Sequence, residues 1–258
     1  MTPPFRADDF SPLGYTRILE RALTRGYRIS PFRDYDPDLH PALILRHDVD
    51  HSLRCANVIG EMESCLGVKS TYFVQVATDF YNLLSSESRG IINQLADHGH
   101  EIGLHYDSRR YSAADAGARL RGDIALLEDL VGQKIVSASQ HIPIDTPTVA
   151  IADFFENDAY SPTFIEEPFV YISDSLMAWR EHHPLDIVES GRSLQLLTHP
   201  MCWAQPVLNI GQALANARQG EIEFLQDAYR QTTAYYESLL AQRSELDEVF
   251  KARRSRRV

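Results

Sequence analysis

The chain has 258 residues, of which 44% are hydrophobic, and carries a formal net charge of −11 at neutral pH. This hydrophobic content can bury a sizeable core, which excludes a chain that is disordered over its whole length. The negative charge argues against a general nucleic-acid partner, because phosphate binding favours a basic surface.

The cysteines and the apolar runs narrow the class of protein further. Cys55, Cys65 and Cys202 form no CxxC pair and are odd in number, which argues against a disulfide framework and a thiolate zinc cluster. The sequence has no run of about 18 apolar residues and no apolar segment of a signal peptide near its start. We therefore expect a cytoplasmic protein with no integral membrane segment.

Helical and strand patterns alternate along most of the chain. The predicted helices cover residues 11–26, 52–67, 86–97, 112–131 and about 147–156. The predicted strands are ALILR (42–46), STYFVQV (70–76), HEIGLH (100–105), KIVSASQH (134–141), PFVYISD (168–174) and LQLLTH (194–199). Such alternation indicates parallel βα units and hence an α/β fold.

The chain becomes mostly helical from residue 207, with Gly211 and Gly220 as candidate breaks. An apolar stripe runs along this segment, and such a stripe more often covers the domain or a twin subunit than binds a cofactor. The C-terminal helices are therefore candidates for a homo-oligomer interface. The last residues, 251–258, form a basic tail that we expect to be solvated.

Apolar runs repeatedly end in a carboxylate or an imidazole. These residues are His47, Asp48, Asp50 and His51 after the first run, and then His105, His141, Asp174 and His199. In a parallel α/β fold the carboxyl ends of the strands share one face, where ligand sites lie. One such residue alone is often a loop cap or a hydrogen-bonded core group. Five apolar runs that all end in this way favour a shared site.

The chemistry of such a site points to a metal. Aspartate and histidine without thiolates suit a divalent ion, most readily Zn²⁺ but also Co²⁺, Ni²⁺ or Mn²⁺. This ion would activate water and polarise a carbonyl for hydrolysis. The sequence shows no GxSxG elbow, phosphate loop, GxGxxG after the first strand or HExxH helix, so the corresponding chemistries find no support.

Three motifs resemble those of the polysaccharide deacetylases, which are metal-dependent N-deacetylases of acetylated sugars. They are LRHDVD, GHEIGLH and LLTHP, and the resemblance covers roughly residues 43–203. It implies an α/β fold of the distorted (β/α) barrel type with about seven parallel strands, extended here by C-terminal helices. We expect a single catalytic domain over 1–258, with a C-terminal helical segment at about 207–250.

The resemblance implies roles for individual residues in the first two motifs. Asp48 corresponds to the general base and Asp50 to a metal ligand, although the intervening Val49 leaves their order open. His105 closes GHEIGLH and corresponds to a second metal ligand. The family usually places another histidine four residues later, but Arg109 stands there.

Another residue must then complete the predicted site. His141, in SQHIP, lies where a third, proline-containing motif of the family would fall, and is our candidate for the remaining ligand. We leave open whether Arg109 contacts an anionic group of the substrate or is a surface charge.

The later motifs imply the rest of the site. ISDSLMAW resembles the family's aspartate-and-tryptophan motif, which gives Asp174 an orienting role and places Trp179 in the pocket wall. The histidine of LLTHP, His199, corresponds to the general acid. Trp203 and Tyr106 are candidates for stacking on a sugar ring.

The leading hypothesis is a metal-dependent hydrolase that removes an acyl group, most plausibly acetyl, from an amino sugar or a glycan precursor. The same fold and metal could instead hydrolyse a non-sugar carbon–nitrogen amide bond. A third hypothesis, motivated by Arg109, is a degenerate carbohydrate-binding protein without catalysis.

Overall fold

The computed structural model describes residues 10–111, 115–143, 151–243 and 247. The chain divides into two compact units, Met1–Leu214 (unit 1) and Ala215–Val258 (unit 2). The predicted basic tail lies outside the described residues. None of the helices within the described ranges has both the length and the apolar character needed to cross a membrane.

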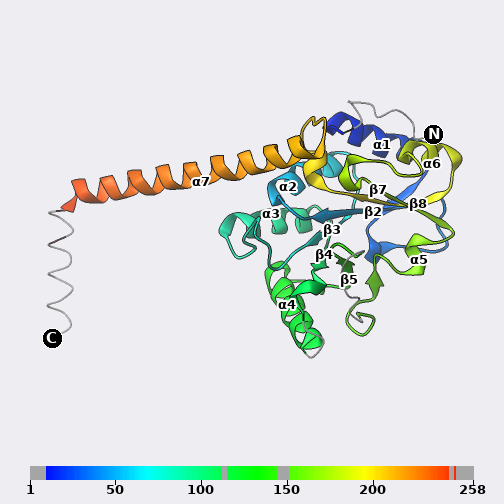
Figure 1. Cartoon of the computed structure of the whole chain (residues 1–258), viewed down its shortest axis with the longest axis horizontal. Helices are drawn as coiled ribbons and strands as arrows, with labels where there is room; N and C mark the ends of the chain where they lie inside the picture. Colours follow the sequence, from blue (N-terminus) through cyan, green and yellow to red (C-terminus); the bar gives the residue numbers. More distant parts are fainter. Residues whose placement is uncertain (1–9, 112–114, 144–150, 244–246, 248–258) are drawn as a thin grey trace. The chain divides into compact units, whose positions relative to one another are not determined.

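Unit 1 is built around one parallel sheet (Figure 1). The strands are β1 (Arg28–Ser30), β2 (Ala42–Val49), β3 (Thr71–Val74), β4 (Glu101–Tyr106), β5 (Ser137–Gln140), β6 (Asn157–Asp158), β7 (Phe169–Ser173) and β8 (Ser193–Thr198). Their order is β6-β5-β4-β3-β2-β8-β7, with β1 paired to β2, and every pair is parallel. No pairing joins β6 to β7 within the described ranges. The sheet is thus a curled, incomplete barrel, which confirms the predicted distorted (β/α) barrel.

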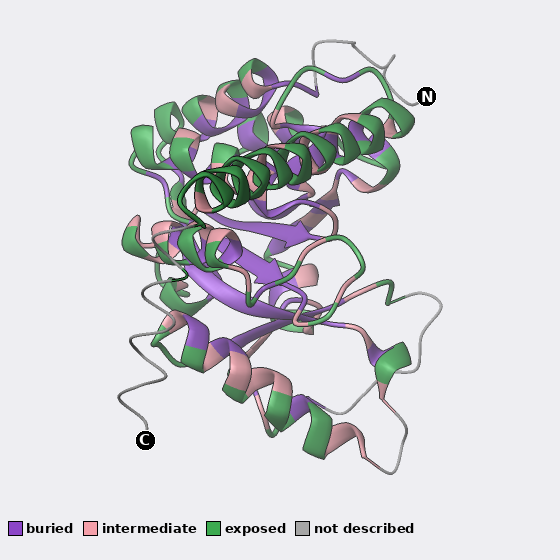
Figure 2. Ribbon diagram, turned by 90° about the vertical axis from the view of Figure 1, so that its left-hand side faces the viewer, coloured by how far each residue is buried: buried purple, intermediate pink, exposed green. Residues whose placement is uncertain are grey.

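Helices follow most of the strands, as the sequence pattern predicts. They are α1 (Pro12–Thr24), α2 (Leu53–Cys65), α3 (Ser86–Asp97), α4 (Ala116–Val131), α5 (Pro162–Ile165) and α6 (Pro184–Ser190). The predicted caps form, since Ser11 Oγ accepts from the Gly14 amide at 3.0 Å and Ser52 Oγ accepts from the Cys55 amide at 3.3 Å. In Figure 2 the strands are buried and the helices expose their outer faces.

The helix predicted at about 147–156 does not form in the part of this range that the structure describes. Residues 151–156 form turns and irregular chain, and the first part of the predicted helix, 147–150, lies outside the described residues. The first part of the helix predicted over 112–131 likewise falls on residues 112–114, which are not described, and α4 begins at Ala116.

Strand β2 runs three residues further than predicted and determines where the site lies. The prediction ended it at Arg46, but it continues through His47 and Asp48 to Val49, and all its residues are buried. Because side chains alternate across a strand, Ile44, Arg46 and Asp48 point to one face. Ile44 packs in an apolar cluster with Phe32, Ala42, Phe73, Ala159, Phe164 and Phe169. The interior of the curled sheet is therefore apolar around Ile44 and polar toward Asp48.

Gly103 in β4 is required by close packing. A Cβ atom at this position would lie 2.5 Å from the Phe73 ring and 3.0 Å from the carbonyl oxygen of Ser137. The absence of a side chain lets β4 pair closely with β3 and β5. This packing fixes the course of the strand that carries His105.

Helix α7 (Ile210–Ala241) is a single element of 32 residues. The breaks predicted at Gly211 and Gly220 do not occur, because an isolated glycine weakens a helix by only about 1 kcal/mol and need not end it. The described residues of unit 2 belong to this helix, apart from residues 242, 243 and 247, which follow it in the chain.

Candidate metal centre

Three of the predicted site residues meet at the carboxyl ends of the strands. Asp50 follows β2, His105 lies near the end of β4 and His141 follows β5. Asp50 Oδ1 lies 3.0 Å from His105 Nε2 and 3.2 Å from His141 Nδ1, and the two nitrogens are 3.1 Å apart. The predicted ligand set thus forms a nearly equilateral triangle of donor atoms.

A backbone contact orients His105 within this triangle. Its Nδ1 lies 3.0 Å from the carbonyl oxygen of Ser139. A carbonyl only accepts hydrogen bonds, so Nδ1 carries a proton, and this contact turns Nε2 toward the centre of the cluster. Metal-bound histidines are commonly held in this way.

The donor set fits a divalent metal ion. Asp50, His105 and His141 are the group of potential ligands found among the described residues, with all their ligand atoms within 4.8 Å of one another. Two ligands about 2.1 Å from a tetrahedral zinc ion are roughly 3.4 Å apart, close to the observed 3.0–3.2 Å. Three protein donors on one side also leave a position open, as catalytic zinc sites do.

The electrostatics of the triangle agree with this assignment. Burial would raise the pKa of the Asp50 carboxyl, but hydrogen bonds from His105 and His141 hold that pKa well below its usual range. Burial would lower the pKa of His105, but the carboxylates of Asp48 and Asp50 raise it.

Asp48 lies beside the triangle and has a different set of partners. Its Oδ2 accepts from Arg46 Nη2 at 2.9 Å and from Ser139 Oγ at 3.2 Å. Its Oδ1 is buried and has no hydrogen-bond partner among the described residues. Burial would raise the pKa of Asp48, but Arg46 lowers it below the usual range. An ionised, buried oxygen without a partner is costly unless a ligand or water occupies the site.

Arg46 is held by a network inside the curled sheet. The fully buried guanidinium donates to Gln195 Oε1 at 2.9 Å and to the Tyr160 hydroxyl at 2.9 Å, in addition to Asp48. Five donors in a rigid fork allow one arginine to satisfy several acceptors at once. The carboxylate of Asp48 is therefore held in position by Arg46 from the interior of the curled sheet.

Asp174 and His199 form the other side of the site. Asp174 Oδ1 lies 2.5 Å from His199 Nδ1, and its Oδ2 accepts from the indole of Trp203 at 2.7 Å. This arrangement turns His199 Nε2 toward Asp50, 3.6 Å from Asp50 Oδ2. Burial would lower the pKa of His199, but Asp174 raises it to about 9. His199 is protonated at neutral pH.

An open cavity of about 350 Å³ adjoins the triangle. Asp50 and His141 line it together with His51, Gln75, Ala77, Thr78, Asp79, Phe80, Asp107, Arg109 and Arg110. Phe80 is 52% exposed, and its ring centroid lies 4.5 Å from that of His51. The neighbouring Tyr81 hydroxyl donates to the Val49 carbonyl at 2.7 Å, which anchors this loop beside the site.

The residues predicted to contact substrate lie in two different environments. Tyr106, Trp179 and Trp203 are buried, so none offers a ring face to the cavity in this structure. Trp203 instead packs on Phe10 and Trp179 with ring centroids 4.7 and 5.9 Å away. Arg109 does line the cavity, and it forms two hydrogen bonds with Asp107 at 2.8 and 2.7 Å.

Sequence reasoning missed Arg46, Ser139 and Phe80. Arg46 did carry a signal, because a charge inside an apolar strand pattern must be paired when it is buried. Ser139 and Phe80 carried none, since a serine in a strand and a phenylalanine in a loop are common without any role in a site.

The fold of this chain is similar to those of several solved structures. No family model and no curated protein matches the sequence. The similar structures include the chitin deacetylase of the fungal pathogen Colletotrichum lindemuthianum (14% identity, 69% of this chain and 81% of that chain, TM-score 0.44). A polysaccharide deacetylase from Bacillus cereus is also similar (12%, 69% and 87%, 0.43). So is a CE4 family pseudoenzyme from Bacillus anthracis (14%, 76% and 66%, 0.42).

These structural neighbours come from the family that the sequence motifs resemble, and they include two proteins named as deacetylases and one named as a pseudoenzyme. At such identities and TM-scores the likeness carries no weight for activity or substrate.

Proposed function

We propose that this protein is a metal-dependent hydrolase that removes an acyl group, acetyl in the first instance, from an amino sugar or a sugar-containing glycan precursor. The observation that carries the proposal is the triangle of Asp50, His105 and His141 between two oppositely charged groups. On one side lies the ionised carboxylate of Asp48, and on the other the protonated imidazole of His199.

Asp50, His105 and His141 would hold the metal ion. A bound divalent ion supplies Lewis acidity, which polarises a carbonyl and makes a bound water acidic near neutral pH. The unpartnered Oδ1 of Asp48 is the acceptor for the proton of the attacking water. Because Arg46 and Ser139 donate their hydrogen bonds to Oδ2, Oδ1 can accept this proton without breaking a hydrogen bond.

His199 is suited to donate a proton to the departing amine. Asp174 holds its Nδ1, which leaves Nε2 directed toward the triangle. A pKa of about 9 keeps the donor protonated at neutral pH, and Asp174 keeps the ring in the orientation for proton transfer. An amide needs this assistance, because an amine leaves poorly as an anion.

The cavity beside the triangle supplies a binding place for the substrate. Phe80 presents an exposed ring at its wall, and Gln75, Thr78 and Asp79 offer polar groups around it. A mixed wall of this kind suits a ligand with both polar groups and an apolar face, as a sugar ring has. Phe80 is thus the aromatic side chain that we assign to substrate contact.

Arg109 motivates a second candidate function, a carbohydrate-binding protein without catalysis. This residue stands where the family's usual ligand histidine would be, and it is paired with Asp107 instead. The second candidate requires that the triangle fail to hold a metal even though His141 completes it.

Elemental analysis of the purified protein separates the two candidates. We expect about one divalent ion per chain in the wild type and in His182→Ala, an exposed histidine outside the site, and loss of the ion in His105→Ala and His141→Ala. Release of acetate from a panel of acetylated amino sugars then tests the reaction. No ion in the wild type after incubation with zinc, cobalt or nickel would exclude the hydrolase and favour the binding protein.

A further inference from the structure

Helix α7 carries a regular apolar line on its surface. Ile222, Leu225, Tyr229, Thr232, Tyr236 and Leu239 follow one another at spacings of three and four residues in strict alternation. We call these six residues the α7 seam. Alternating spacings of three and four are the sequence pattern by which two helices pair along their length.

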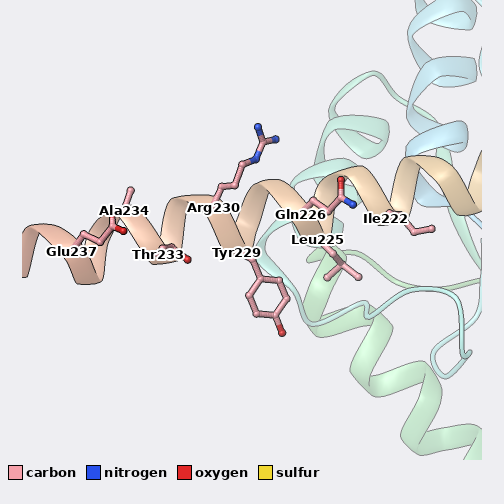
Figure 3. Close-up of a pocket in the computed structure, with 8 residues that line it drawn as sticks. All are labelled: Ile222, Leu225, Gln226, Tyr229, Arg230, Thr233, Ala234 and Glu237. Carbon is pink, nitrogen blue, oxygen red and sulfur yellow. The ribbon is translucent and has the colours of Figure 1, made fainter.

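The seam forms an open face of one helix rather than a cleft. Figure 3 shows Leu225 and Tyr229 on the same side of α7, with Arg230 pointing the other way. All eight residues drawn there, Ile222, Leu225, Gln226, Tyr229, Arg230, Thr233, Ala234 and Glu237, belong to this helix. The described residues of unit 2 are those of α7 and residues 242, 243 and 247, so among them no second element covers the seam.

The area of this face reaches what a stable interface needs. Four large apolar residues of the seam and two beside it are between 38% and 73% exposed: Ile222, Leu225, Tyr229 and Tyr236 in the seam, and Tyr235 and Leu240 beside it. They amount to on the order of 600 Å² per helix, or about 1,200 Å² if two such faces meet, which is the lower end of the standard size of specific interfaces. An isolated helix gains little stability without such packing.

Charge and length point to a second copy of the same helix as the partner. The positions flanking the seam are Glu221, Gln226, Ala228, Thr233, Tyr235, Leu240 and Gln242, of which only Glu221 is charged. Two copies can therefore approach without a line of like charges between them. Helix α7 is about 48 Å long at 1.5 Å per residue. The seam itself runs from Ile222 to Leu239, 18 residues of that helix, whereas the longest helix of unit 1 within the described ranges, α4, has 16 residues.

We propose that the α7 seam is a homodimer interface, in which α7 of one chain pairs with α7 of a second copy as a two-stranded coiled coil. The contact is isologous, because the same face is buried on both chains. Tyr229 lies near the middle of the seam, where large aromatic side chains contribute most to binding. This interface is independent of the proposed chemistry in unit 1.

Light scattering coupled to size-exclusion chromatography tests the proposal on the full chain. We expect twice the 29.3 kDa of one chain at micromolar concentration. Leu225→Glu and Tyr229→Glu should each weaken dimerisation at least roughly 30-fold, because each substitution buries a charge in the interface. Ser238→Glu introduces the same charge away from the seam and should leave the dimer intact.

The outcomes are separated by mass and by thermal unfolding. A monomeric wild type overturns the proposal; if Leu225→Glu then lowers its melting temperature independently of protein concentration, the seam is covered within its own chain. A dimer that survives both substitutions also overturns it, because another surface must then hold the chains together. Metal content, measured in the same samples, reports on unit 1 separately.

Discussion

Two buried polar clusters lie on opposite faces of β2 and use consecutive residues of the same strand. The inner cluster consists of Arg46, Asp48, Ser139, Tyr160 and Gln195. The outer cluster consists of Tyr15, His47, Glu63, Ser70 and Tyr72. Both contain a buried carboxylate among hydrogen-bond donors, yet only one belongs to the candidate site.

The difference lies in whether the carboxylate is satisfied. Both oxygens of Glu63 accept hydrogen bonds, Oε1 from Tyr15 and His47 and Oε2 from Ser70 and Tyr72. Asp48 has one oxygen bonded and one without a partner among the described residues, beside side chains that line a cavity. A closed network stabilises the fold, whereas an open one has capacity left for a ligand or a proton.

The largest effect should come from Asp48→Asn. If Asp48 accepts the proton of water, the variant loses roughly 1,000-fold in kcat because Asn cannot act as a base. It should retain the metal, since the triangle of Asp50, His105 and His141 is unchanged. Breaking the buried pair with Arg46 should also destabilise the protein by about 3 kcal/mol. Turnover per folded molecule, metal content and urea unfolding measure the three quantities.

An activity loss smaller than about tenfold in a folded, metal-loaded Asp48→Asn protein would contradict the assignment of Asp48 as the base. In that case Asp48 would resemble Glu63 in having a role in stability alone. The inner and outer clusters would then no longer differ in function.

Glu63→Gln should lower the stability of the protein and leave its activity unchanged. A Gln side chain has one acceptor oxygen in place of the two of Glu63, and it lacks the negative charge that interacts with His47. We therefore expect a loss of about 3 kcal/mol in the free energy of unfolding. Metal content and turnover per folded molecule should stay at wild-type values. A loss of metal would show that the outer cluster supports the site rather than only the fold.

The outer cluster also predicts a pH dependence. Burial would raise the pKa of Glu63, but His47 and the hydrogen bond from Tyr15 hold it at about 2, compared with an ordinary value of 4.5. The stabilisation is therefore complete above pH 4.5 and is lost as the pH falls toward 2, which corresponds to about 3 kcal/mol. Denaturant unfolding should show a steeper loss below pH 4.5 in the wild type than in Glu63→Gln. An equal dependence of stability on pH in the two proteins would contradict the lowered pKa of Glu63.

The clusters also show what the sequence could and could not predict. Local signals were sufficient for α1 and α2, because Ser11 and Ser52 cap helices whose apolar residues repeat with the helical period. The positions of Asp50, His105 and His141 followed from one rule, that carboxyl ends of parallel strands share a face. The residue patterns therefore predicted the α/β fold and the convergence of these side chains, whereas the barrel form and the ligand roles of Asp50, His105 and His141 came from the resemblance to the deacetylases, and the ligand roles stay a prediction.

The partners of buried charges could not be predicted in this way. Glu63 lies on the inner face of α2, and its partners come from α1, β2, β3 and the residue before β3. Arg46 likewise bonds to residues about 90 to 150 positions away. Such contacts depend on three-dimensional packing and leave no periodic trace. The same holds for Trp203, whose burial no local pattern distinguishes from exposure in a pocket.

Phe80→Ala should have a smaller effect, confined to substrate binding. Removal of an exposed ring from the cavity wall should raise KM about tenfold and leave kcat within about twofold, because the ring contacts substrate and transition state alike. Phe80→Tyr keeps the ring and serves as the matched control. An equal loss in kcat and kcat/KM would instead assign Phe80 to the chemical step.

Arg109→Gln should have the smallest effect and contrasts with Arg46, which is fully buried. The Arg109 side chain is 53% exposed and pairs with Asp107 two residues away, so solvent screens the pair. We expect the free energy of unfolding to change by less than about 0.5 kcal/mol. The effect on KM decides between the two interpretations of this residue. A neutral substrate group near Arg109 would leave KM unchanged, whereas an anionic group would raise KM in Arg109→Gln and less so in Arg109→Lys, with the increase shrinking at high salt.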